Sequence, residues 1–152
     1  VKAGRGNDGV PELMMNAFAG MTDRFENPKT PNDWIALEEA GVADHGADPF
    51  NNLGNVPNVQ SLYDTGVLMK SIIGEEWATK VPVELPIYNI GGDQDPVTSY
   101  GEGTYTITNW LCETGHCVVT KVYSGFRHEI HNEPPIRNEV EDGIIEFIDS
   151  IA

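Results

Sequence analysis

One stretch near the middle of the chain constrains the fold more than any other: LPIYNIGGDQDPV, at residues 85–97. Its first half is a near-continuous apolar run, which is typical of a strand in a parallel sheet covered on both faces. Gly91 and Gly92 follow, and because glycine adopts backbone angles that other residues resist, they predict a sharp turn. Asp93 and Asp95 then fall at the carboxyl end of the strand, where ligands bind in open α/β sheets. The stretch predicts a functional acid in an α/β fold.

A second apolar run, CVVTKVY at residues 117–123, predicts the next strand, and His128 follows it after a short glycine-containing turn. His128 lies 33 positions after Asp95. An acid after one strand and a histidine after the next form the second half of a nucleophile–acid–histidine order. Position alone leaves a second interpretation open, in which both are ordinary loop residues.

The two loops also carry recognisable motifs. LPIYNIGGDQDPVTSYGEG followed by VYSGFRHEIHNE closely resembles the α/β-hydrolase branch of monoacylglycerol lipases, lysophospholipases and serine aminopeptidases. In that branch a G-D-x-D-P-V loop carries the catalytic acid, and an R-H-E-x-x-N-E loop carries the catalytic histidine. Residues 30–50, TPNDWIALEEAGVADHGADPF, resemble the cap domain of the same branch. The resemblance spans nearly the whole chain and is weakest before Phe25.

The resemblance assigns the catalytic acid to Asp95, the aspartate before the proline, and the catalytic histidine to His128. Asp95 would accept the histidine's Nδ1–H, hold its tautomer and stabilise the imidazolium. Asp93 is expected to support the turn, because aspartate satisfies loop amides well. His131 occupies a position that is more often apolar in the family, and is expected to be a supporting hydrogen-bond partner or a surface residue.

The residues beside His128 are interpreted as supports of the loop. Arg127 and Glu129 flank the histidine in the motif, and we expect them to hold the loop, with Asn132 or Glu133 as a nearby ion-pair partner.

A nucleophile motif is absent from the sequence. Enzymes of this branch carry their serine in a G-x-S-x-G elbow upstream of the cap, and an oxyanion-hole loop also lies upstream. Neither occurs here, and α/β hydrolases usually need roughly 250 residues or more in one domain. The expected architecture is the C-terminal part of an α/β-hydrolase fold, with two parallel core strands, flanking helices and a helical cap segment. We expect residues 1–80 to be part of the cap and residues 81–152 to be the C-terminal part of the core.

Apolar spacing predicts the helices around these strands. Helices are expected over residues 10–21, 58–73 and 136–151, a short helix after Asn32, and a loop followed by a helix over residues 100–115. Gly143 inside the last of these costs about 1 kcal/mol relative to alanine, which predicts close packing against the sheet.

Charge and cysteine content exclude several kinds of partner. A net charge of −15 and a pI near 4.4 argue against nucleic acid and against anionic membrane surfaces. Cys112, His116 and Cys117 lack the paired spacing of zinc sites, so no metal is expected. Free thiols in a reducing, cytoplasmic location are expected, with a small-loop disulfide as the alternative. His45 and His116 lie in polar, glycine-flanked loops and are expected to be solvated.

The resemblance implies a serine carboxylic-ester hydrolase that acts on a small acyl-ester or lipid-like substrate without a metal or organic cofactor. The serine would come from the missing N-terminal half, so this chain is expected to be inactive by itself. Two alternatives stay open: the same triad acting on amide or peptide bonds, and a non-catalytic hydrolase-like binding protein. The strand at residues 85–90 would leave an unpaired edge, which predicts self-association or pairing with the missing half.

Overall fold

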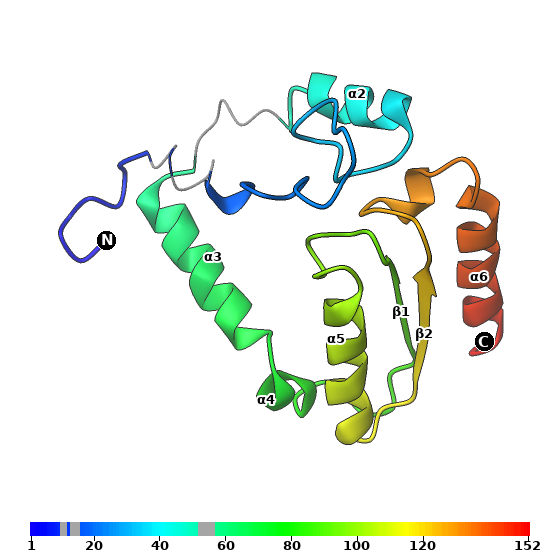
Figure 1. Cartoon of the computed structure of the whole chain (residues 1–152). Helices are drawn as coiled ribbons and strands as arrows, with labels where there is room; N and C mark the ends of the chain where they lie inside the picture. The colour runs from blue at the N-terminus through cyan, green and yellow to red at the C-terminus, as the bar shows by residue number, and fades with distance from the viewer. Residues whose placement is uncertain (10–11, 13–15, 52–56) are drawn as a thin grey trace.

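The computed structural model describes residues 1–9, 12, 16–51 and 57–152 (Figure 1). Part of the helix predicted over residues 10–21, including Val10, Leu13 and Met14, lies outside these ranges. The elements in chain order are α2 (Glu39–Ala47), α3 (Val59–Ser71), α4 (Glu75–Ala78), β1 (Ile87–Gly92), α5 (Glu102–Glu113), β2 (Val118–Tyr123), the short 3₁₀ helix η1 (Ile130–Asn132) and α6 (Arg137–Asp149).

The two strands form a parallel pair, in register from Ile87 opposite Val118 to Gly92 opposite Tyr123. Helix α5 connects them and lies on one side of the pair, while α6 lies on the other (Figure 1). Because the strands are parallel, their carboxyl ends meet at one edge, and the loops that follow them lie beneath α2 and its preceding segment (Figure 1). The predicted α/β architecture of two parallel strands with flanking helices is confirmed.

Gly91 and Gly92 do not form the turn that the sequence predicted. Strand β1 continues through Gly91 and Gly92, neither has a positive φ, and the turn begins at Asp93. A Cβ on Gly92 would lie 2.2 Å from the carbonyl oxygen of Phe126 and 2.3 Å from that of Arg127. The predicted turn at the glycines was therefore wrong: Gly92 is required because the histidine loop passes too close for any side chain.

The helices that flank the strands match their apolar spacing. Helix α5 stops before Gly115, which adopts a left-handed φ of 93° as helix-ending glycines commonly do. In α6, a Cβ on Gly143 would lie 3.0 Å from the hydroxyl of Tyr88 and 3.8 Å from that of Tyr123. The predicted close packing of Gly143 against the sheet is confirmed.

Residues 34–37 do not form the short helix expected after Asn32. Trp34, Ile35 and Ala36 are buried in irregular backbone, and the helix α2 begins only at Glu39. The carbonyls of Trp34 and Ile35 accept hydrogen bonds from the amides of His128 and Glu129. Long-range bonds to the histidine loop have replaced the local bonds that a helix would make.

Among the described residues, most of the buried apolar side chains lie in two clusters. One contains Trp34, Ile35, Ala36 and Val42; the other contains Tyr123, Ile130, Ile136 and Val140. By contrast, α3 has no buried residue, and several large apolar side chains of α3 and α6 are exposed. These are Tyr63, Val67, Leu68, Met69, Ile145 and Ile148. Within the described part of the chain, no helix has the length and hydropathy to cross a bilayer.

Candidate active site

Asp95 and His128 meet at the edge where the two parallel strands end. The Nδ1–H of His128 donates a hydrogen bond of 2.9 Å to Oδ2 of Asp95, which is 2% exposed. The side chain of His128 is 39% exposed, so the pair has a buried acid and an accessible ring. With the proton on Nδ1, the neutral ring carries its lone pair on Nε2, as a general base requires.

The loop after β1 fixes the orientation of the Asp95 carboxylate. The second carboxylate oxygen, Oδ1, accepts a hydrogen bond of 2.8 Å from the amide of Val97. The backbone carbonyl of Asp95 accepts one of 2.7 Å from the amide of Tyr100. Ser99 and Tyr100 both adopt a positive φ, of 51° and 60°, which non-glycine residues rarely do. Local backbone strain in this loop is therefore offset by bonds that hold the acid in place.

Asp93 joins the acid loop to the histidine loop. Its Oδ1 accepts a hydrogen bond of 2.7 Å from the amide of Gly125, and its Oδ2 accepts one of 2.8 Å from the hydroxyl of Ser124. Partial burial alone would raise the pKa of Asp93, but these bonds and one from Gln94 lower it below its usual 3.8. Asp93 thus supports the turn, as expected, while the histidine ring bonds to Asp95.

The environment of His128 favours its protonated form. The hydrogen bond to Asp95 raises the pKa of the imidazole above 6.5; partial burial opposes this, and the charges of Asp95 and Glu129 reinforce it. The ring of Trp34 lies beside the imidazole, with 5.3 Å between centroids. An imidazole that gains a proton readily and is held by a buried carboxylate is suited to general acid–base chemistry.

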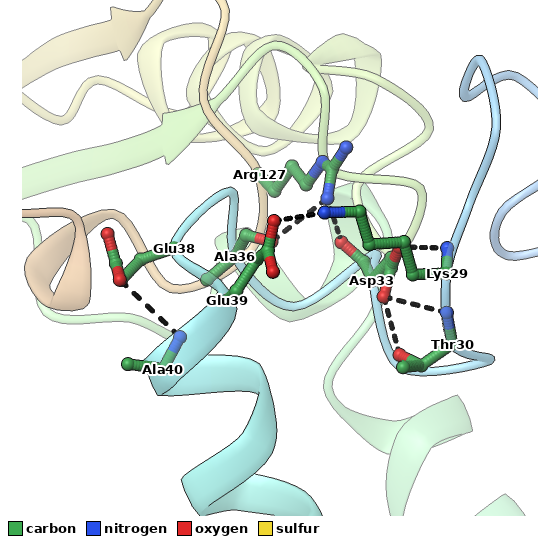
Figure 2. A network of polar contacts seen from close by, with 8 residues as sticks. All are labelled: Lys29, Thr30, Asp33, Ala36, Glu38, Glu39, Ala40 and Arg127. Atoms are coloured by element: carbon green, nitrogen blue, oxygen red, sulfur yellow. Dashed lines mark hydrogen bonds and ion pairs between the residues drawn. The ribbon is translucent and has the colours of Figure 1, made fainter.

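Arg127 supports the histidine loop through partners that the sequence did not indicate. Its Nη1 donates to the carbonyl of Asp33 and, at 2.9 Å, to that of Ala36 (Figure 2). Its guanidinium also lies 4.2 Å from the ring centroid of Phe25. The expected ion pair with Glu133 was therefore wrong.

Glu129, the other residue that flanks His128, has a local partner. Its Oε2 accepts a hydrogen bond of 2.7 Å from the side chain of Asn132, as the sequence suggested.

The other histidines lie apart from Asp95. His131 is exposed in η1, whereas His45, at the end of α2, lies 3.8 Å from Glu129. His116 was expected to be solvated but is only 6% exposed. Its Nε2–H donates to the carbonyl of Val81, 35 positions earlier, a contact that the polar neighbours of His116 in the sequence could not indicate.

Two cavities lie near the histidine loop, and neither is lined by Asp95 or His128. One, of about 600 Å³, lies between α2 and the start of α6 and includes His45, Glu129 and Arg137. The other, of about 480 Å³, is lined by Arg127, Lys29 and Leu37 among others. In the described residues no cluster of three or more histidine, cysteine or acidic side chains could hold a metal ion. The side chain of His128 is exposed and lines neither of these two cavities.

Solved structures show which fold this arrangement belongs to. The chain matches a highly thermostable carboxyl esterase from Bacillus coagulans, solved in complex with glycerol, with 55% sequence identity and a TM-score of 0.94. The match covers 99% of this chain and 48% of the esterase. The fold is thus the C-terminal part of an esterase/lipase α/β-hydrolase fold.

A second solved structure, of a lipase in its open form, agrees. It is 33% identical with a TM-score of 0.87, and the match covers 98% of this chain and 48% of the lipase. The chain therefore spans about half the length of both proteins. No family model and no curated protein matches the sequence.

Proposed function

We propose that this chain supplies the acid and the histidine of a Ser–Asp–His triad in a carboxylic-ester hydrolase. The observation that carries the proposal is the 2.9 Å bond between the buried carboxylate of Asp95 and the Nδ1 of an accessible His128. The structural matches to an esterase and a lipase support ester bonds, over the amide bonds that the motif alone left open.

The proposed chemistry uses His128 first as a base and then as an acid. Its Nε2 takes the proton of a serine hydroxyl as the serine oxygen attacks the ester carbonyl, and Asp95 stabilises the imidazolium. Collapse of the tetrahedral intermediate breaks the bond to the alcohol, which leaves with the proton from His128. Water, deprotonated by the same nitrogen, then releases the acid and regenerates the serine.

The serine comes from a half of the molecule that is not in this chain, because no serine here lies in a G-x-S-x-G context. We propose that this half covers the exposed apolar side chains of α3 and α6 and pairs with the edge of β1 that has no strand neighbour among the described residues. Burial of apolar surface contributes about 25 cal/mol per Å², which favours such an association over exposure to water. A lysophospholipase- or monoacylglycerol lipase-like ester is the substrate class that the loop motifs favour.

A hybrid protein tests the proposal. This chain would be joined to the upstream half of the Bacillus coagulans esterase, to which its own half is 55% identical. We expect the hybrid to hydrolyse p-nitrophenyl esters, and His128→Ala to abolish this activity while cooperative melting is retained. A folded hybrid whose activity is the same with and without His128→Ala would contradict the proposal.

A further inference from the structure

Residues 33–37 and the histidine loop, residues 127–133, are joined by five hydrogen bonds across more than 90 positions of sequence. Two come from the guanidinium of Arg127, which donates to the carbonyls of Asp33 and Ala36 (Figure 2). Two come from the amides of His128 and Glu129, which donate to the carbonyls of Trp34 and Ile35. In the fifth bond the donor belongs to the other segment: the amide of Leu37 donates a hydrogen bond of 2.5 Å to Oε1 of Glu133.

Glu133 is the least expected member of this set. Its side chain is 1% exposed, and burying a carboxylate is costly unless it accepts hydrogen bonds. Its carbonyl also accepts the amides of Ile136 and Arg137, at the start of α6. Glu133 therefore joins the end of the histidine loop, the first turn of α6 and the far end of residues 33–37.

The segment held in this way contacts the catalytic ring directly. Trp34 packs beside the His128 imidazole, and its carbonyl accepts the His128 amide at 3.4 Å. Trp34 and Ile35 are themselves buried, so they have little freedom to move independently. Any loosening of residues 33–37 is therefore transmitted to both the backbone and the ring of His128.

We infer that Arg127 and Glu133 are positioning residues that hold residues 33–37 against the histidine loop and thereby keep the His128 ring on Asp95. Arg127 bonds to Asp33 and Ala36, and Glu133 bonds to Leu37, so that the residues on both sides of Trp34 and Ile35 are held. This inference rests on the proposed function and deepens it, because it assigns to two non-reacting side chains the geometry on which proton transfer depends.

The pKa of His128, measured by NMR titration of its ring protons in this chain, tests the inference without any assay of activity. If the positioning is lost, the bond to Asp95 is populated less and the pKa should fall toward 6.5. Glu133→Ala removes the acceptor for the Leu37 amide and should show this fall. The matched control, Glu133→Gln, removes the charge but retains a carbonyl acceptor, and should keep the pKa near that of the wild type.

Arg127→Met separates geometry from charge. Loss of a nearby cation would by itself raise the pKa of His128, whereas loosened positioning lowers it. A fall in this variant can therefore come only from geometry, and it decides the question if Glu133→Ala does not fold. An unchanged or raised pKa in folded Arg127→Met, or equal falls in Glu133→Ala and Glu133→Gln, would overturn the inference.

Kinetics of the hybrid esterase distinguish this inference from the proposed function. Glu133→Ala should lower kcat by about 100-fold with little change in KM, because displacing a catalytic group by about 1 Å costs that much. Failure of the proposed function would appear as a hybrid that is inactive even with wild-type residues. Failure of the inference would appear as an active hybrid in which Glu133→Ala leaves kcat unchanged.

Discussion

Replacing Gly92 with alanine should separate the acid loop from the histidine loop. The added Cβ would lie 2.2 Å from the carbonyl oxygen of Phe126 and 2.3 Å from that of Arg127, and real Cβ contacts are essentially never closer than 3.0 Å. The histidine loop must therefore move by about 0.8 Å at this point. Both contacting atoms belong to the backbone, so no side-chain rotation can relieve the overlap. We expect a destabilisation of about 3 kcal/mol, at the upper end of the range for overpacking.

Gly91→Ala is the matched control, one residue earlier in the same strand. Its Cβ would meet only the side-chain hydroxyl of Thr104, at 3.0 Å. Alanine also has fewer conformations than glycine in the unfolded chain and so loses less entropy when the strand forms, which favours folding by roughly 0.5–1 kcal/mol. We expect Gly91→Ala to remain within about 1 kcal/mol of the wild type.

Urea unfolding followed by tryptophan fluorescence measures both variants, with the midpoints compared at a common m-value. NMR titration of His128 measures the consequence for the site. In Gly92→Ala the pKa of His128 should fall toward 6.5, because the loop that carries the ring has moved away from Asp95. Equal stability of the two variants, or an unshifted His128 pKa in Gly92→Ala, would refute the reasoning.

Three further predictions follow from the same geometry. This chain alone should hydrolyse p-nitrophenyl esters no faster than buffer, and turnover that disappears in His128→Ala would contradict the need for a second half. In sedimentation at micromolar concentration the chain alone should self-associate, since β1 has β2 as its one strand neighbour among the described residues and large apolar side chains of α3 and α6 are exposed; a folded monomer would contradict this. Because Asp95 raises the pKa of His128, the pair stabilises the fold fully below pH 6.5 and loses this contribution as pH rises through the raised pKa. The free energy of unfolding should therefore decline across that window, and a decline of equal size in Asp95→Asn would contradict the assignment.

The positions of Asp95 and His128 could be predicted because they depend on short-range sequence. Each follows an apolar run that forms a strand, and adjacent parallel strands bring their carboxyl ends to the same edge. Helices α3, α5 and α6 were likewise visible in their apolar spacing and in residues such as Asn58, whose side chain caps α3. The catalytic role of Asp95 and His128 is a proposal.

The remaining features depend on contacts between distant residues. Nothing near Leu37 or Glu133 indicates that they bond across 96 positions, and this pairing is why residues 34–37 are not helical. Gly92 appeared to be a turn residue because its need for space comes from carbonyls 34 and 35 positions later. His116 appeared to be solvated because the carbonyl of Val81 that it contacts is remote in sequence. The division into a cap over residues 1–80 and a core over residues 81–152 remains a prediction.

The pH dependence of kcat/KM in the hybrid esterase tests the central claim most directly, because its acid limb reports the pKa of the free enzyme's base. The limb should coincide with the NMR-measured pKa of His128, above 6.5. In Asp95→Asn the limb should move to lower pH, and kcat should fall by about 10⁴-fold, as expected when the tautomer is no longer held. An acid limb at a pH that differs from the measured pKa of His128, or one that does not shift in Asp95→Asn, would contradict the account.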